Sequence, residues 1–178
     1  MPTARLIVFS GLPGVGKSTI AARLAQRLDA AWLRIDAIEH GLRDSHLCLA
    51  DDLKDAGYAA ARVLAADNLR LGRSVIADAV HGLAIVRDPW LDVARRVGSR
   101  PRFVHLVCSD LEEHRRRVEQ RTPLDPGARL PRWAEVEARE FAPWPDERKA
   151  WTVETARGTA AEIADDLAAR ITADGAPG

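Results

Sequence analysis

The residues from Gly11 to Thr19 have the types and spacing needed to bind a nucleoside triphosphate. They read Gly-Leu-Pro-Gly-Val-Gly-Lys-Ser-Thr and fill the pattern G-x4-G-K-[ST]. Glycines allow a tight turn that brings backbone N–H groups against phosphate oxygens, and the following helix adds the positive end of its dipole. Lys17 is expected to reach the β- and γ-phosphates, and the Ser18 hydroxyl to bind Mg²⁺. The predicted nucleotide-binding residues are Gly11, Gly14, Val15, Gly16, Lys17, Ser18 and Thr19.

A glycine-rich turn that matches this pattern by chance is the alternative. The composition disfavours it, because the chain has only three lysines and one of them stands at position 17. The flanking residues also agree with the functional interpretation. A short apolar run precedes the loop, as a buried strand would, and Ile20, Leu24 and Leu28 recur every four residues after it, as in a helix.

Asp36 follows the apolar run 31–35 and is the candidate general base. A carboxylate within hydrogen-bond reach of an attacking hydroxyl can orient it and accept its proton late in phosphoryl transfer. Two structural alternatives stay open. Asp36 could cap a helix that begins at Ala37, or it could form a surface ion pair with Arg43.

Asp78 follows a second apolar run, residues 74–77, and is the candidate metal ligand together with Ser18. Mg²⁺ takes few carboxylates and completes its coordination with waters and phosphate oxygens, so one aspartate beside one hydroxyl is sufficient. Asp78 could instead bind the acceptor substrate. A turn cap at the end of the strand is the structural alternative.

Arginines supply the remaining candidates. A helix over residues 111–121 would place Arg117 and Arg121 one turn apart on one face, where they could offset the charge of a transferring phosphoryl group. A solvated helix with pairs such as Glu113–Arg117 is the alternative. Arg43 and Arg87 each follow a strand end and are candidates for binding an acceptor, with plain salt bridges as the alternative.

Apolar runs alternate with helical patterns, which predicts the elements that position these residues. We expect strands at 5–9, 31–35, 74–77, 102–107 and 151–153, and helices at 17–28, 51–71, 86–97, 111–121, 133–141 and 159–171. This alternation indicates an α/β fold, a parallel sheet with helices on both faces. Ligands of such sheets bind at the carboxyl ends of the strands, where the glycine-rich loop, Asp36 and Asp78 all fall.

Length and charge limit the classes of function. A chain of 178 residues suggests one domain, which we place at residues 1–173 with a flexible tail at 174–178. Lys and Arg together number 26, as do Asp and Glu, and this neutral balance disfavours avid binding to long nucleic acid. Cys48 and Cys108 lack metal-type spacing, and neither a membrane-spanning stretch nor a signal-peptide pattern is present, so a cytoplasmic protein is expected.

The sequence resembles the small P-loop kinases, a group with polynucleotide 5′-hydroxyl kinases, zeta-toxin-like kinases, chloramphenicol phosphotransferase and gluconate kinase. The resemblance extends to about Ile171. It is carried by the loop at 11–19, by Ile35-Asp36 with Arg43, by Val75-Ile76-Ala77-Asp78 with Arg87, and by Arg117 with Arg121. It implies a P-loop NTPase fold with a five-stranded parallel sheet and a mobile lid, at about residues 117–145, that brings arginines to the phosphates.

The resemblance also implies an activity, an ATP-dependent transfer of the γ-phosphate of MgATP to a hydroxyl of a small molecule such as a nucleoside, sugar or antibiotic. Lys17, Asp36, Arg117 and Arg121 would be catalytic, and Asp36, Arg43, Asp78 and Arg87 would bind the acceptor. Two alternatives stay open. One is a kinase of nucleic-acid 5′-hydroxyls, although a small molecule is favoured over nucleic acid as the partner. The other is an ATP-binding switch without an acceptor.

Overall fold

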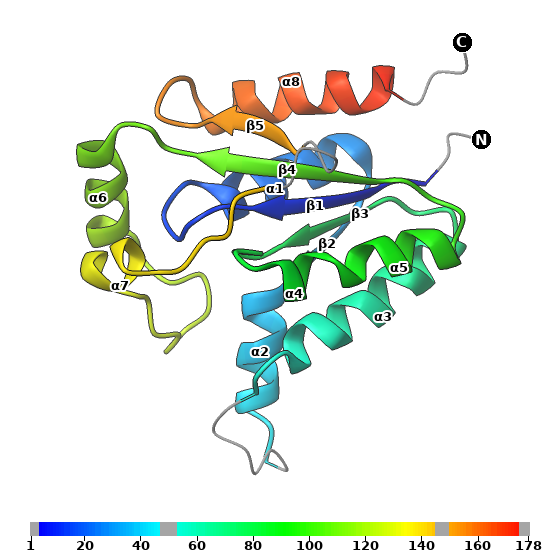
Figure 1. Ribbon diagram of the computed structural model, residues 1–178, viewed down its shortest axis with the longest axis horizontal. Helices are drawn as coiled ribbons and strands as arrows, with labels where there is room; N and C mark the ends of the chain where they lie inside the picture. Colours follow the sequence, from blue (N-terminus) through cyan, green and yellow to red (C-terminus); the bar gives the residue numbers. More distant parts are fainter. Residues whose placement is uncertain (1–3, 47–52, 145–149, 175–178) are drawn as a thin grey trace.

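Five parallel strands form the centre of the protein, in the order β2-β3-β1-β4-β5 (Figure 1). The computed structural model describes residues 4–46, 53–144 and 150–174. The strands are β1 (Leu6–Ser10), β2 (Ala31–Arg34), β3 (Val75–Asp78), β4 (Pro101–Val107) and β5 (Trp151–Glu154). In the register of β1, β2 and β3, Arg34 lies beside Asp78 and Asp78 beside Phe9, so the chemistry-bearing residues that follow these strands emerge at one edge.

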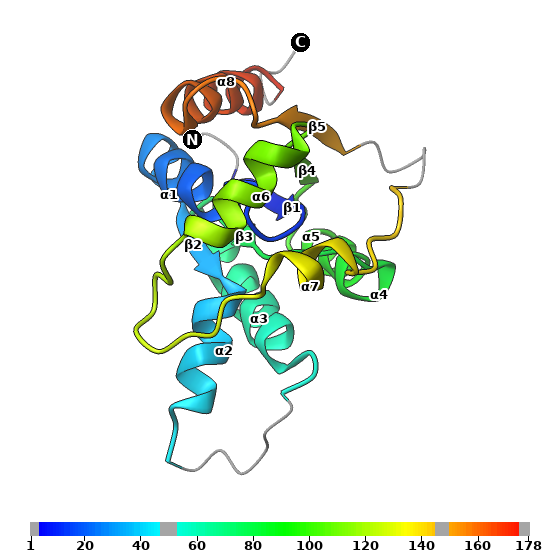
Figure 2. The same cartoon turned by 90° about the vertical axis from the view of Figure 1, so that its left-hand side faces the viewer.

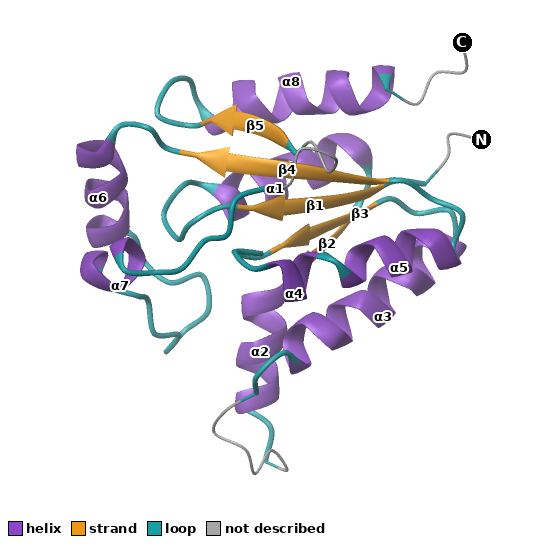
Figure 3. Ribbon diagram, viewed as in Figure 1, coloured by secondary structure: helices purple, strands orange, loops and turns teal. Residues whose placement is uncertain are grey.

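Helices cover both faces of the sheet (Figure 3). Helices α1 (Lys17–Leu28) and α8 (Ala160–Ala173) lie on one face, and α3 (Ala56–Arg70), α4 (Ala84–Arg87) and α5 (Pro89–Arg96) lie on the other. Helix α2 (Ile35–Arg43) continues directly from β2. Helices α6 (Leu111–Gln120) and α7 (Trp133–Glu137) stand at the carboxyl ends of the strands (Figure 1). The predicted α/β class and five-stranded parallel sheet with helices on both faces are therefore confirmed.

Alternation along β1 produces the two layers of the core. Ile7 and Phe9 pack with α1 and α8, whereas Leu6 and Val8 pack with α3 and α5. All four side chains are fully buried. A strand that is covered on both faces carries apolar residues at successive positions, which explains the short uninterrupted apolar runs in the sequence.

Several predicted elements differ in their bounds from the observed ones; the helix expected at 51–71, for example, begins at Ala56. The helix expected at 86–97 is two helices, α4 and α5, because Pro89 begins a new helix, where its missing N–H costs nothing. The helix expected at 133–141 ends at Glu137. The strand expected at 31–35 ends at Arg34, and helix α2 begins at once with Ile35.

The helices and the cysteines bear on the membrane and cysteine predictions. Among the described residues, none of the helices combines the length and the apolar character that crossing a bilayer requires. Cys108 is buried and its thiol donates to the carbonyl of Asp110, 3.5 Å away. Cys48 lies outside the described residues.

Candidate active site

The loop between β1 and α1 has the conformation that its glycines predict. Gly14 and Gly16 have φ values of +90° and +93°, in the left-handed region that favours glycine, and Gly16 directly precedes α1. The N–H of Gly11 donates to the carbonyl of Val80 at 3.0 Å, which ties the loop to the residues after β3. The Gly11 amide therefore fixes the loop in place, and phosphate contacts are left to later residues of the loop.

We expect Gly11→Ala to destabilise the protein by about 3 kcal/mol or more, because it combines a clash with backbone strain. A Cβ at Gly11 would lie 2.3 Å from the carbonyl oxygen of Leu106, which belongs to β4, and its φ is +141°. Gly72→Ala is the matched control, since Gly72 also has a positive φ, +80°, but nothing within 4 Å of its Cβ position. Urea unfolding of both variants checks the prediction. Equal losses in the two variants would show that the clash contributes nothing.

Lys17 lies buried at the base of the loop. Its Nζ donates to the carbonyl of Leu12 at 2.9 Å. Burial lowers the pKa of Lys17 to about 8; the carboxylates of Asp78 and Asp36 oppose this shift, and the nearby arginines add to it. The lysine charge is therefore held at a cost in this site, and an anion placed beside it would relieve that cost.

Asp78 and Ser18 form the pair that the sequence predicts for a metal. Asp78 is buried, accepts hydrogen bonds from the Ser18 hydroxyl and from Nε1 of Trp32, the latter at 3.2 Å, and interacts with Lys17. Burial raises the pKa of Asp78, against the opposing effects of Lys17 and these hydrogen bonds. A hydroxyl and a carboxylate are the hard oxygen donors that Mg²⁺ prefers. A magnesium ion at this pair would take its other ligands from phosphate and water. Among the described residues, no group of three or more His, Cys, Asp or Glu side chains is placed to hold a metal ion.

Asp36 is exposed in the first turn of α2 and faces the same site. Its charge acts on Lys17, Asp78 and Arg121. The N-cap of α2 is Arg34, so the alternative that Asp36 caps a helix starting at Ala37 is wrong. The carboxylate is consequently left exposed beside the buried lysine, the position that a base for an incoming hydroxyl requires.

Glu39 and Tyr58 extend the site on the side of α2 and α3. Burial, then the charge of Asp36, raises the pKa of Glu39. Burial, with the charges of Asp36 and Glu39, raises the pKa of Tyr58 to about 12, so the phenol stays protonated. Tyr58 was not among the predicted residues. No local pattern marks it, because its approach to Asp36 depends on how α3 packs against α2.

Arg117 and Arg121 do not act from one helix face. Helix α6 ends at Gln120, and Arg121 has the extended values φ −69° and ψ 147°. Arg121 is thereby turned toward the site, where its charge interacts with Asp36 and Lys17, and burial lowers its pKa. Arg117 instead donates to Glu113 at 2.7 Å and to the carbonyl of Thr155 at 2.9 Å. The predicted pair of phosphate-facing arginines is thus divided, and the alternative Glu113–Arg117 pair is present.

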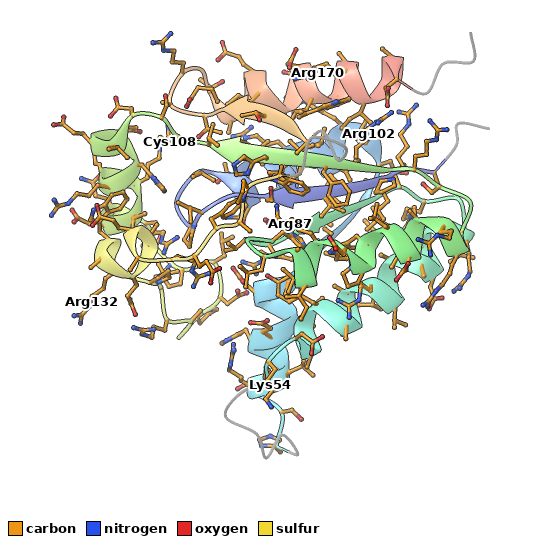
Figure 4. The ribbon with its side chains drawn as sticks, in the orientation of Figure 1. Lys54, Arg87, Arg102, Cys108, Arg132 and Arg170 are labelled. Carbon is orange, nitrogen blue, oxygen red and sulfur yellow. The ribbon has the colours of Figure 1, made fainter. Side chains whose placement is uncertain are left out.

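Arg139 is a site residue that the sequence analysis missed. Its charge acts on Lys17, on Arg121 and on Tyr58, so it lies where the loop, the segment after α6 and the α3 side meet. It follows α7 by one residue. Among 23 arginines in the chain, sequence alone offers nothing to single this one out. Arg132 is exposed on the outer side of α7 (Figure 4).

Arg43 and Arg87 occupy structural positions here. Arg43 has a half-exposed side chain and pairs with Glu39 at 3.5 Å, as the salt-bridge alternative predicts. Arg87, labelled in Figure 4, is buried and donates to the carbonyls of Gly82 and Ala142. Its guanidinium carbon lies 4.4 Å from the centroid of the Trp144 ring. Arg87 therefore joins α4 to the segment after α7, and its Nη2 donors are bound to backbone carbonyls.

His81 connects the site to the core as a neutral side chain. It is fully buried with φ +45°, and burial lowers its pKa to about 4. Nε2 accepts from Nε1 of Trp90 at 2.9 Å, so the ring proton is on Nδ1, which donates to the carbonyl of Phe9 at 2.6 Å. Both ring nitrogens are satisfied, so His81 braces the strand ends and is not a ligand.

Comparison with known families agrees with this geometry. Residues 6–139, about three quarters of the sequence, match the AAA domain family. The chain belongs to the AAA domain family. The match begins with β1 and the glycine-rich loop and ends at Arg139. Among curated proteins, no sequence matches this AAA domain.

Solved structures share the fold of this AAA domain at low sequence identity. The Mycobacterium tuberculosis APS kinase CysC in complex with AMPPNP and APS superposes with a TM-score of 0.69 at 20% identity, covering 96% of this chain and 99% of that one. A gluconokinase from Sinorhizobium meliloti 1021 gives 0.66 at 20%, covering 98% and 97%. Chaetomium thermophilum Kti12 in complex with ADP-AlF3 gives 0.69 at 19%, covering 97% and 100%. The fold is thus that of a small P-loop kinase.

Nucleotide binding to this AAA domain is expected to take up a proton at mildly alkaline pH. The pKa of Lys17 is about 8 in the free protein, and phosphate anions beside the ammonium would raise it. At pH 8.5 we expect uptake of roughly three quarters of a proton per MgAMPPNP bound, falling to about 0.1 at pH 7. Calorimetry in buffers of different ionisation enthalpy measures this uptake. Enthalpies that are independent of the buffer at pH 8.5 would contradict the assignment of Lys17.

Proposed function

We propose that this AAA domain is an ATP-dependent phosphotransferase that moves the γ-phosphate of MgATP to a hydroxyl of a small molecule of nucleoside, sugar or antibiotic type. The observation that carries the proposal is the meeting of Lys17, Asp78, Asp36 and Arg121, from four separate segments, at the carboxyl edge of the sheet. A nucleotide-binding loop alone would need only the first two. The exposed carboxylate and the arginine are the additional parts that transfer to an acceptor requires.

In the proposed reaction, the residues act from the segments that position them. The Lys17 ammonium exchanges the carbonyl of Leu12 for β- and γ-phosphate oxygens, and Ser18 and Asp78 are the residues that would hold Mg²⁺. The metal, when bound, neutralises phosphate charge. Asp36 orients the acceptor hydroxyl and takes its proton as the new oxygen–phosphorus bond forms and the bond to the ADP leaving group breaks.

Arginines complete the proposed site from the segment after α6. Of the two arginines predicted to face the phosphoryl group, Arg121 fits this role better, since its charge acts on both Lys17 and Asp36. Arg139 adds a second positive charge on the Tyr58 side. Fixed positive groups that face the transferring phosphoryl group stabilise the charge that it carries between the leaving and attacking oxygens.

MgATP consumption measured against a panel of acceptors tests the proposal. The panel holds nucleosides, sugars, aminoglycoside-type and phenolic antibiotics, and 5′-hydroxyl RNA and DNA oligomers, with Lys17→Ala as the blank. We expect one class of small hydroxyl compounds to stimulate turnover. Stimulation by oligomers alone would replace this function with a 5′-hydroxyl kinase. Tight MgATP binding without stimulated turnover would replace it with an ATP-binding switch.

A further inference from the structure

The segment from Arg121 to Arg132 forms a loop between α6 and α7 on the α2 side of the molecule (Figures 1 and 2). At its base, Nη2 of Arg121 donates to the carbonyl of Pro131 at 3.1 Å. Its tip is a β-turn from Asp125 to Ala128, in which the N–H of Ala128 donates to the carbonyl of Asp125 at 3.1 Å. Pro126 and Gly127, the latter with φ +80°, suit the two central positions of a type II turn. The loop therefore presents Asp125 from a defined turn.

The tip of this loop is joined to β2 by one ion pair. Nη2 of Arg34 lies 2.5 Å from Oδ1 of Asp125, and the two side chains are only 16% and 21% exposed. A pair this well shielded is screened less than an ion pair in open water. It also joins residues 91 positions apart in the sequence, so no local propensity of the loop would place them together.

Arg34 is connected to two residues of the proposed site, Asp36 along the chain and Asp78 through Trp32. It is the last residue of β2 and the N-cap of α2, two positions before Asp36. Its guanidinium stacks over the ring of Trp32 at 5.7 Å, and the indole N–H of Trp32 donates to Asp78. The loop that contacts Arg34 begins with Arg121. The pair thus connects the loop arginine, the candidate base and the candidate metal ligand.

We propose that Arg34 and Asp125 are positioning residues that hold the 121–132 loop closed over the Lys17–Asp36 site and so fix Arg121 beside the transferring phosphoryl group. The role in transfer rests on the proposed function, whereas the closure of the loop does not. When the pair is intact, the loop is fixed at its base by Pro131 and at its tip by Arg34, and the Arg121 side chain has a defined direction. When the pair is broken, the contacts near the base of the loop remain, but the tip loses its ion pair to β2.

A second ion pair on the same segment provides a matched control. Arg129 and Glu135 also approach to 2.5 Å, but their side chains are 77% and 41% exposed. Glu135 belongs to the first turn of α7, so this pair joins the loop to the helix that follows it and makes no bridge to β2. Exposed pairs contribute little to stability. Arg129→Gln therefore removes a charge and an ion pair without releasing the tip.

Hydrogen exchange of the loop amides tests closure directly, in the full chain, with and without MgAMPPNP. In Asp125→Asn we expect the amide of Ala128, which is hydrogen-bonded in the closed loop, to exchange about tenfold faster than in the wild type, the effect of losing a charge-assisted contact on local opening. The charge-swapped double variant, Arg34→Asp with Asp125→Arg, is expected to restore slow hydrogen exchange, and Arg129→Gln to leave the exchange rate as in the wild type. A wild-type exchange rate in Asp125→Asn would overturn the proposal. Fast exchange in the charge-swapped variant would also overturn it, provided that the unfolding midpoint of that variant equals that of the wild type.

Turnover separates this proposal from the proposed function. With an acceptor from the panel, Asp125→Asn is expected to lower kcat about tenfold while KM for MgATP stays within twofold of the wild-type value. The charge-swapped double variant is expected to recover kcat. A purely structural role would change the unfolding midpoint and not this split, and equal kcat in Asp125→Asn and wild type would overturn the positioning role. Absence of acceptor-stimulated turnover in the wild type would count against the proposed function, and the exchange measurement would still decide closure.

Discussion

Asp36→Asn is expected to cut acceptor-dependent phosphoryl transfer by about 10²-fold or more, with the affinity for MgATP nearly unchanged. Asparagine keeps the size of the side chain and its place in the first turn of α2, but it cannot accept the proton of the acceptor hydroxyl. Asp36 is exposed, so the change leaves no buried group without a partner. Initial rates give kcat and KM for the acceptor, and calorimetry gives the affinity for MgAMPPNP.

Glu39→Gln is the matched control for this prediction. Glu39 lies three residues further along α2 and is half-buried, with its pKa raised by burial and by Asp36. Its replacement removes the same kind of charge from the same side of the site, and we expect less than a fivefold loss of kcat, typical of a neighbouring charge rather than a base. Unchanged kcat in Asp36→Asn would rule out Asp36 as the base. A loss of 10²-fold in Glu39→Gln alone would move the role to Glu39.

The sequence predicts the parts of this site that depend on local structure. The glycine-rich loop carries its own backbone requirement at Gly14 and Gly16, and the apolar runs before Asp36 and Asp78 place these residues at strand ends. Parallel pairing then brings strand ends together without further information. For this reason, the glycine-rich loop, the candidate metal pair and the candidate base could be predicted from the sequence.

The arginines show why the other residues of the site could not be predicted from the sequence. One residue decides the direction of Arg121, because α6 ends at Gln120 and a helix that continued to residue 121 would have kept Arg117 and Arg121 on one face. Helix ends are the least reliable part of a secondary-structure prediction from sequence. Arg139 and Tyr58 reach the site through the packing of α7 and α3, which local patterns do not encode. Arg87 follows a strand end as predicted, but burial against Trp144 gives it a structural position.

Lys17→Met is expected to lower transfer by about 10²- to 10³-fold, because it removes a fixed positive charge from the transferring group. The same change is expected to make the nucleotide-free protein more stable at pH 7, by about 1–2 kcal/mol. Methionine preserves much of the apolar stem, whereas the wild-type ammonium is buried with its pKa lowered to about 8. The residue that the proposed reaction most requires is thus one that the empty fold holds at a cost.

The pH dependence gives this trade-off its sign. In the unfolded chain Lys17 has its ordinary pKa of 10.5, so between about pH 8 and 10.5 the unfolded state binds more protons than the folded state. The stability of the wild type therefore gains a contribution as pH rises through this window, and the advantage of Lys17→Met shrinks there. Urea unfolding of both proteins at pH 7 and pH 10, without nucleotide, measures the difference. The buried-charge argument would be contradicted if Lys17→Met were less stable than the wild type at pH 7, or if its stability advantage grew toward pH 10. With saturating MgAMPPNP, we expect the wild type to be the more stable protein, because only the wild type gains the full binding energy.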